Sequence, residues 1–185
     1  DIAVIKTNCA QLNIDLVLVD IDKKNGTISK QALSYLNPDD YCAFIFPQIN
    51  QFGILEDVDF LTDFCYQNNL ISVASIDLAH ISSGCMKPPR EFGTNEVGVN
   101  MFIAEGQHLA LAPNFGGPGI GIMGIRYHAE DKQSIRQTPG RYIGKSKDLF
   151  GRECKSLILS TREQHIRRDK ATSNICSNQS FIASI

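Results

Sequence analysis

The sequence predicts an α/β fold with a mostly parallel sheet flanked by helices. Short apolar runs alternate with longer amphipathic runs, which is the order of strand–helix–strand units. The apolar runs are continuously hydrophobic, a pattern typical of strands that are buried on both faces. In such sheets ligands bind outside the carboxyl ends of the strands. We therefore expect the informative positions in the loops at 47–53, 77–87, 105–118 and 161–178.

The first part of the chain predicts one helix end, one strand and one capped helix. Residues 2–12 have the pattern of the end of a helix. The run LVLVDI at 16–21 is rich in β-branched residues and predicts a buried strand. Ser29 is placed to cap a helix from Lys30 to Leu36, which the following Asn-Pro pair ends.

Three further strands are predicted at 41–46, 70–77 and 99–105. Between the first two, residues 55–68 have the apolar spacing of an amphipathic helix. The apolar face of that helix is made by Val58, Leu61, Phe64 and Cys65.

We expect residues 1–185 to form a single α/β domain that is part of a longer subunit. No strand precedes the helix end at 2–12, and the last residues, NQSFIASI, stop inside an apolar helical pattern without a cap or breaker. An α/β domain rarely ends in this way.

The composition is that of an ordinary globular protein. Of the 185 residues 43% are hydrophobic and 21% are charged, which excludes collagen and intrinsic disorder. The chain has no apolar run of about 18 residues that would predict a membrane span. Its start has no basic segment followed by an apolar one, so it does not resemble a signal peptide.

Charge is unevenly spread along the chain. The formal net charge is −2, but residues 126–170 carry 12 Lys and Arg against 6 Asp and Glu. The other residues carry 6 against 14. This asymmetry indicates a surface that meets an anionic partner, or a set of solvated basic loops.

The six cysteines and four histidines are dispersed. No CxxC pair is present, and a structural zinc site needs paired ligands at tight spacing. We expect no metal site and a reducing, cytoplasmic setting.

A GxGxxG pattern occurs at Gly119–Gly124. The dinucleotide-binding form of this motif needs a turn between a strand and a helix. Here the glycines lie in GIGIMGIRY, which has strand character. We interpret Gly119–Tyr127 as a strand with glycines where another backbone comes close.

Two other short motifs have a functional and a structural interpretation. Asp77 and His80 directly follow a predicted strand, where a carboxylate can bind a cofactor's ring nitrogen and a histidine can stack on a ring or move protons. A helix cap and a packed histidine are the structural alternative. Gly116 and Gly117 lie in a tight turn whose backbone N–H groups can face a ligand, or which simply connects two elements.

The stretch at 162–176 is the most informative. Five potential cations, Arg162, His165, Arg167, Arg168 and Lys170, precede a small polar group, Thr172, Ser173 and Asn174, that can cap a helix. This order suits carboxylate or phosphate binding by Arg side chains and helix-terminal amides. Nucleic-acid binding is not expected, because no aromatic residues are interleaved for stacking. A helix with internal ion pairs is the other open interpretation.

The same stretch, REQHIRRDKATSNICSNQ, closely resembles the P-protein family of the glycine cleavage system. Four more blocks match in order: FPQINQFGILED, MKPPREFG, EGQHLALAPNFGGPGIG and TPGRYIGKSKDLFGRE. In many bacteria the P protein is split into two homologous polypeptides, and these blocks are similar to subunit 1. The resemblance implies the large domain of the aspartate-aminotransferase-like (fold type I) enzymes, in which Gly119–Tyr127 would be the antiparallel strand.

The resemblance also implies a shared function. Fold type I enzymes bind pyridoxal phosphate through a lysine that follows a late strand. The loop after Val99–Glu105 contains no lysine; the nearest are Lys87 and Lys132. We therefore expect no catalytic residue and no covalently bound cofactor in this chain, with pyridoxal phosphate on the homologous glycine dehydrogenase subunit 2. The lipoylated H protein would receive the aminomethyl group.

In this interpretation Arg162, Arg167, Arg168, Thr172, Ser173, Asn174, Gly116 and Gly117 are candidate interface or pocket-edge residues. Three alternatives remain. They are an autonomous pyridoxal-phosphate enzyme such as an aminotransferase or lyase, a nucleotide-binding module, and a purely structural paralogue.

Overall fold

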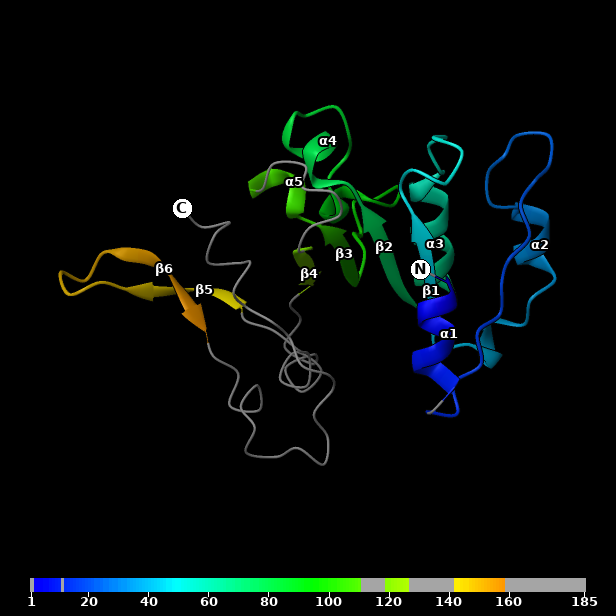
Figure 1. Cartoon of the computed structure of the whole chain (residues 1–185), viewed down its shortest axis with the longest axis horizontal. Coiled ribbons are helices and arrows are strands. Elements are labelled where there is room, and N and C mark those ends of the chain that lie inside the picture. Colours follow the sequence, from blue (N-terminus) through cyan, green and yellow to red (C-terminus); the bar gives the residue numbers. More distant parts are fainter. Residues whose placement is uncertain (1, 11, 111–118, 127–141, 159–185) are drawn as a thin grey trace. The chain divides into compact units, whose positions relative to one another are not determined.

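The computed structural model describes residues 2–10, 12–110, 119–126 and 142–158 (Figure 1). The chain divides into two compact units, Asp1–Asp77 with Lys87–Val99, and Leu78–Met86 with Asn100–Ile185. We call them the first and the second unit and describe each by itself. That residues 1–185 form a single domain stays a prediction.

The described residues contain both helices and strands, as an α/β fold requires. The helices are α1 (Ile2–Ala10), α2 (Lys30–Ser34), α3 (Val58–Gln67), α4 (Leu78–Ser82) and α5 (Gln107–Ala110). Two short 3-10 helices are η1 (Pro38–Asp40) and η2 (Pro89–Glu91). The strands are β1 (Ala43–Pro47), β2 (Ile71–Ile76), β3 (Met101–Glu105), β4 (Gly121–Ile125), β5 (Tyr142–Lys147) and β6 (Glu153–Ile158). The strand order of the sheet is β1-β2-β3-β4, and β5 and β6 form a separate hairpin.

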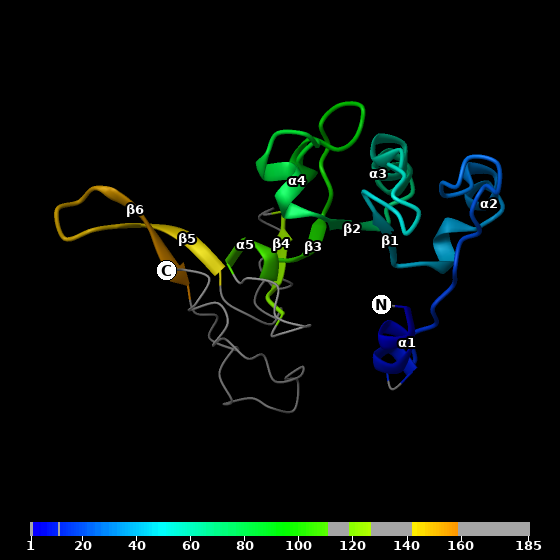
Figure 2. The ribbon, with the colours of Figure 1, turned by 45° about the horizontal axis from the view of Figure 1, so that its top comes forward.

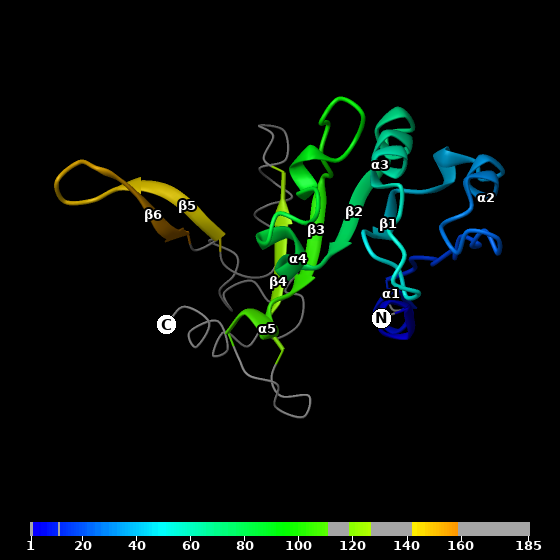
Figure 3. The same ribbon diagram turned by 90° about the horizontal axis from the view of Figure 1, so that it is seen from above.

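The first unit is built on the parallel pair of β1 and β2. The register places Ala43 opposite Ile71 and Pro47 opposite Ser75. Helix α3 connects the two strands and packs against both, which is visible in Figure 3. The order β1–α3–β2 confirms the predicted alternation of strand, helix and strand.

Helix α2 begins at the capped start that the sequence predicts, whereas α3 begins three residues after the start of the predicted helix at 55–68 and is capped by Asp57, a cap that was not predicted. The Ser29 hydroxyl accepts the Ala32 N–H at 3.1 Å, so α2 starts at Lys30 as expected and ends two residues before Leu36. The Asp57 carboxylate accepts the Phe60 N–H at 3.2 Å and caps α3. In α3 the buried residues are Leu61, Thr62 and Cys65.

The core of the first unit comes from these elements and from the segment at 92–99. Its buried apolar residues are Leu33, Phe46, Leu61, Cys65, Leu70, Ala74, Ile76, Phe92 and Val99. Full burial of a Leu, Ile, Val or Phe side chain contributes about 1.5–3 kcal/mol to stability, so this cluster stabilises the unit.

The predicted strand at 16–21 is wrong. The structure places no strand there, and Val17 and Leu18 are 49% and 55% exposed. A strand needs a neighbour for its backbone groups, whereas here the Asp20 carbonyl accepts the Ser29 N–H, which closes a local turn. Only an isolated bridge between Ile21 and Ile28 remains.

The expected burial of the strands on both faces is also not found in β1 and β2. Along β2, Ser72, Ala74 and Ile76 are buried, whereas Ile71 is 45% exposed. On β1 the exposed fraction of Ile45 is also 45%. The described part of the first unit therefore covers only one face of this strand pair.

The second unit contains two antiparallel pairs. Strands β3 and β4 pair from Met101–Ile125 to Glu105–Gly121, so the strand predicted within Gly119–Tyr127 is present and antiparallel as expected. Strands β5 and β6 pair from Tyr142–Ile158 to Lys147–Glu153. Figure 2 shows this hairpin as a long two-stranded ribbon that ends in a tight turn. This hairpin was not predicted from the sequence.

Candidate functional site

The residues predicted from the basic stretch lie outside the described residues. Arg162, Arg167, Arg168, Thr172, Ser173 and Asn174 belong to the range 159–185, and Gly116 and Gly117 belong to 111–118. Their roles stay predictions. The described candidate residues lie in the loops that follow β1 and β2 and, in the second unit, in the loop that follows β3.

Asp77 directly follows β2, as predicted, and α4 begins at the next residue. Asp77 is half-buried, and His80 on α4 is exposed. The structural alternative of a packed histidine is therefore wrong for His80.

The glycines at 119–124 do not form a nucleotide-binding turn. Gly121 and Gly124 are part of β4, and Gly124 pairs with Phe102 on β3. A Cβ atom on Gly124 would overlap the Phe102 ring, so it is an aromatic side chain, and not another backbone, that requires this glycine. The predicted strand is confirmed, and the reason given for this glycine is corrected.

Glu105 closes the loop that follows β3. Its Oε1 accepts the N–H groups of Ile120 and Gln107 at 2.7 and 2.8 Å. These hydrogen bonds, from Ile120 above all, hold the pKa of the Glu105 carboxyl below its usual range. Glu105 is thus an ionised residue that fixes the loop, and not a general acid at neutral pH.

The loop after β1 is fixed by Asn50 and Glu56. The Asn50 amide donates to the Glu56 carboxylate at 2.8 Å and to the Gly26 carbonyl at 2.7 Å. The buried Glu56 carboxylate also accepts the Ile28 N–H at 2.9 Å. Gly26 has φ +70° and lies against Ile54, where a Cβ would come within 2.8 Å of the Ile54 Cδ1 atom. These bonds join the block at 46–57 to the turn at 20–29.

Gln48 links the carboxyl ends of β1 and β2 to the loop at 86–94. It is 4% exposed; its backbone N–H donates to the Ser75 carbonyl, and its side-chain amide donates to the Lys87 carbonyl, both at 2.9 Å. Its Oε1 atom is buried and has no donor among the described residues. A buried carbonyl oxygen without a hydrogen-bond donor lowers the stability of the fold. The Oε1 atom of Gln48 can therefore accept a hydrogen bond from an additional N–H or O–H group.

Lys87 is held by the first turn of α3. Its ammonium lies 2.8 Å from Oδ1 of Asp59, and the same oxygen accepts the Gly93 N–H at 2.7 Å. One turn later Asp63 accepts the Thr94 N–H at 3.2 Å and also the Thr94 hydroxyl. The two carboxylates therefore fasten the MKPPREFG block to α3.

Comparisons with known proteins decide the family. The profile of the glycine cleavage system P-protein family matches residues 1–185. The chain belongs to this family.

Relatives in three organisms show the part of the P protein that is matched. The chain is 37% identical over 179 residues to a protein of Methylococcus capsulatus, 38% over 180 residues to one of Nitrosomonas europaea and 40% over 169 residues to one of Coxiella burnetii. Each is named "Probable glycine dehydrogenase (decarboxylating) subunit 1". These matches cover 97%, 97% and 91% of this chain but only 38%, 38% and 36% of the relatives.

A solved structure shares the fold. It is a crystal structure of glycine decarboxylase (P-protein) in inhibitor-bound form, with a TM-score of 0.72 and 28% sequence identity. The match covers 98% of this chain and 37% of that one. The predicted α/β fold with a mostly parallel sheet is thereby confirmed, and the chain spans little more than a third of the length of its relatives.

The P-protein assignment raises the question of pyridoxal phosphate. Lys87 does not fit the position of a Schiff-base lysine, because it lies in a loop that precedes β3 and its side-chain nitrogen is bound by Asp59 at 2.8 Å. The N-terminus of α3 does not fit a phosphate site, because Asp57 and Asp59 place two carboxylates there. Neither Lys87 nor the N-terminus of α3 thus fits this cofactor. Lys132 lies outside the described residues.

Neither a metal centre nor a membrane helix is found in the described ranges. No group of three or more His, Cys, Asp or Glu is placed to hold a metal ion there. None of the helices in that part of the chain is both long and apolar enough to cross a membrane.

Proposed function

We propose that this chain is part of the subunit of glycine decarboxylase that does not carry the cofactor. The complete enzyme would decarboxylate glycine and pass the aminomethyl group to the lipoyl arm of the H protein. Pyridoxal phosphate on the homologous subunit 2 would supply the electron sink for the decarboxylation. This chain would supply the paired half of the complex, and we place the complex in the cytoplasm.

The single observation that carries the proposal is the match of the P-protein profile to residues 1–185. The names of the relatives favour subunit 1. The position of Lys87 supports the second part of the proposal, because this lysine precedes β3 and its side-chain nitrogen is bound by the Asp59 carboxylate.

The network of Gln48, Asn50 and Glu56 suggests how the chain contributes. It makes rigid the loops at the carboxyl ends of β1 and β2, where ligands of open α/β sheets gather. We propose that these loops line one wall of the active-site entrance. As a separate proposal, the basic stretch with Arg162, Arg167 and Arg168 contributes to the interface with subunit 2. A basic surface there also suits an acidic carrier protein.

Reconstitution tests this proposal. The native polypeptide that carries this sequence is mixed with its homologous pyridoxal-phosphate subunit and lipoylated H protein, and glycine-dependent exchange of labelled bicarbonate is measured. We expect exchange only when all three proteins are present. Exchange by this polypeptide and H protein alone would show that it is an autonomous pyridoxal-phosphate enzyme.

A purely structural role makes a different prediction in the same assay. If the chain has no part in the pocket, the triple variant Thr172→Ala, Ser173→Ala, Asn174→Ala leaves KM and kcat of the assembled enzyme intact. Under our proposal at least one of the two constants changes, while the assembly measured by size-exclusion chromatography is kept.

A further inference from the structure

The turn at 20–29 contains the pair Asn25–Gly26. This is the only place in the sequence where Asn directly precedes Gly. Asparagine is a thermolabile residue. It is most labile before glycine, because no Cβ atom hinders the approach of the following backbone nitrogen to the side-chain amide. Asn25 is exposed in the structure, so this turn has the residues that spontaneous deamidation needs.

Deamidation uses only the chain and one water molecule. The Gly26 nitrogen loses its proton and attacks the Asn25 Cγ atom. The new C–N bond closes a succinimide ring, and the C–N bond of the side-chain amide breaks to release ammonia. Water then adds to one of the two ring carbonyls and opens the ring to aspartate or isoaspartate. In isoaspartate the main chain runs through the former side chain and is one CH₂ group longer.

Asp22 binds both groups that must react. Its carbonyl oxygen accepts the Gly26 N–H at 2.7 Å, and its Oδ2 atom accepts an N–H of the Asn25 amide at 2.8 Å. Its Oδ1 atom accepts the Lys24 N–H at 2.9 Å. The first two hydrogen bonds must break before the attack, because the Gly26 nitrogen has to lose its proton and the Asn25 amide has to turn towards it. Asp22 therefore opposes the reaction in the folded chain.

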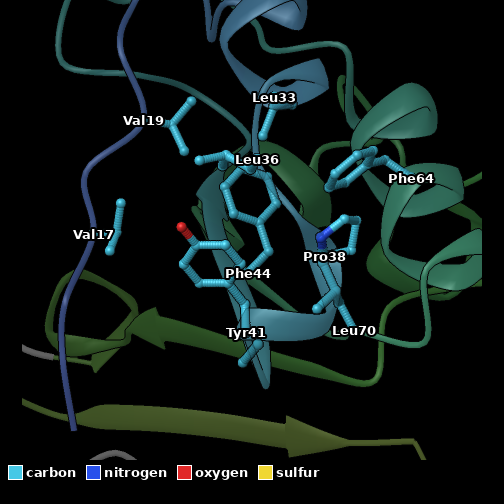
Figure 4. A pocket seen from close by; sticks show the side chains of 10 residues that line it. Val17, Val19, Leu33, Leu36, Pro38, Tyr41, Phe44, Phe64 and Leu70 are labelled. Carbon is cyan, nitrogen blue, oxygen red and sulfur yellow. The ribbon is translucent and has the colours of Figure 1, made fainter.

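The two flanks of the turn are anchored in the first unit. Figure 4 shows Val17 and Val19, on the segment before the turn, and Leu33, on α2 after it, around one apolar pocket of about 50 Å³. Within the turn the Asp22 N–H donates to the Thr27 carbonyl at 2.8 Å. Closure of a succinimide ring changes the backbone of the turn, and these contacts oppose that change.

The turn is also bound to the loop after β1. The Gly26 carbonyl accepts an N–H of the Asn50 amide at 2.7 Å, and the Ile28 N–H donates to the Glu56 carboxylate at 2.9 Å. A longer main chain between residues 25 and 26 displaces the Gly26 carbonyl. Isoaspartate at position 25 therefore breaks the hydrogen bond to Asn50 and loosens the loop at the carboxyl end of β1.

We propose that Asn25 is a site of spontaneous deamidation and that Asp22 slows this reaction in the folded chain. Unfolding of the turn, or loss of the Asp22 carboxylate, makes the reaction faster. The isoaspartate that forms separates the turn from Asn50. This modification site is independent of the proposed function, because it requires neither a cofactor nor a partner.

Peptide mapping of aged protein tests the proposal. The native polypeptide that carries this sequence and its Asp22→Ala variant are incubated at mildly alkaline pH, and the deamidated peptide that contains position 25 is quantified over time by mass spectrometry. We expect Asp22→Ala to raise the rate about fivefold, the factor that corresponds to the loss of one hydrogen bond of about 1 kcal/mol. Equal rates in the two folded proteins would overturn the role of Asp22.

The matched control is Asp20→Ala. Asp20 is exposed and contributes to the turn through its carbonyl, which accepts the Ser29 N–H and is kept in the variant. This variant should deamidate at the rate of the parent protein. In urea, where the turn is lost, the parent, Asp20→Ala and Asp22→Ala should share one rate that exceeds the rate of the folded parent. Equal rates of the parent protein with and without urea would show that the fold gives no protection.

Hydrogen exchange measured by NMR tests the effect on the loop. The isoaspartate form is separated from the parent protein by ion-exchange chromatography. We expect faster exchange of the Ile28 N–H in this form, and unchanged exchange of the Leu70 N–H, which donates to the Cys65 carbonyl at the end of α3. Equal exchange of the Ile28 N–H in the two forms would contradict the loosening of the loop. Far-ultraviolet circular dichroism checks that every variant keeps its secondary structure.

Discussion

Glu56 is the buried acceptor on which the loop after β1 depends. Replacing Glu56 with Ala leaves the Ile28 N–H and one Asn50 donor bond without an acceptor, which should lower the free energy of unfolding by about 2 kcal/mol. Urea denaturation measures the change. The control is Gln51→Ala in the same loop, where an exposed side chain should change stability by less than about 0.5 kcal/mol. An equal loss of stability in the Glu56→Ala and Gln51→Ala variants would contradict the role of Glu56 as a buried acceptor.

Cys65 makes stability sensitive to alkaline pH. Burial raises the pKa of its thiol from 9.0 to about 12, because the interior disfavours the thiolate. Below pH 9 both the folded and the unfolded chain hold the proton, and the stabilisation is complete. As the pH rises from 9 towards 12 only the unfolded chain loses the proton, so stability falls.

The matched variant is Cys65→Ala. Between pH 8 and pH 10 the free energy of unfolding of the parent protein should fall by about 1 kcal/mol more than that of the variant. Denaturant titrations at the two pH values measure this difference. Identical pH dependence would show that the thiol is not buried in the folded protein.

At the scale of elements, the pairing of β3 with β4 requires glycine at 124. A Cβ atom there would overlap the Phe102 ring, whereas nothing lies within 4 Å of a Cβ on Gly121. Gly124→Ala should therefore lower stability by about 1–3 kcal/mol, and Gly121→Ala should change it by less than about 0.5 kcal/mol. Thermal unfolding of both variants compares them. A larger loss of stability for Gly121→Ala than for Gly124→Ala would contradict the register of β3 and β4, in which Gly124 pairs with Phe102.

The elements that could be predicted are those with a local signal. Ser29 and the apolar spacing of 55–68 specify the start of α2 and the position of α3 through contacts a few residues apart. The run at 16–21 has strand propensity but finds no neighbour, and pairing is a property of the whole sheet. The β5–β6 hairpin was not predicted, although its turn residues Asp148 and Gly151 are a local signal for a turn.

The candidate site was predictable only in part, for a physical reason. The position of Asp77 after a strand follows from local sequence. The links from Glu56 to Ile28, from Gln48 to Lys87 and from Asp59 to Gly93 join residues 28, 39 and 34 positions apart. Such contacts depend on the packing of α3 against β1 and β2, which spacing in the sequence does not reveal. In retrospect, the matched blocks at 46–57 and 86–93 were the signal that these loops belong together.

At the scale of the whole molecule, the basic stretch is predicted to hold the complex together. The triple variant Arg162→Ala, Arg167→Ala, Arg168→Ala should weaken assembly with subunit 2 about tenfold or more, since charge-assisted hydrogen bonds contribute about 1.5–3 kcal/mol when both partners are buried. Analytical ultracentrifugation of the mixture measures assembly. A matched control, Lys23→Ala with Lys24→Ala, removes two exposed charges from the turn at 20–29. Unchanged assembly and turnover in the arginine variant would contradict the proposed role of the basic stretch in the interface with subunit 2.

The central claim is that this chain does not provide the cofactor lysine. The most direct measurement is incubation of the native polypeptide with pyridoxal phosphate, reduction with borohydride, and intact mass with peptide mapping. We predict no lysine labelled stoichiometrically in this chain, and one in subunit 2 treated in parallel. Stoichiometric labelling of a single lysine here, Lys87 or Lys132 included, would contradict the claim and make the chain catalytic in its own right.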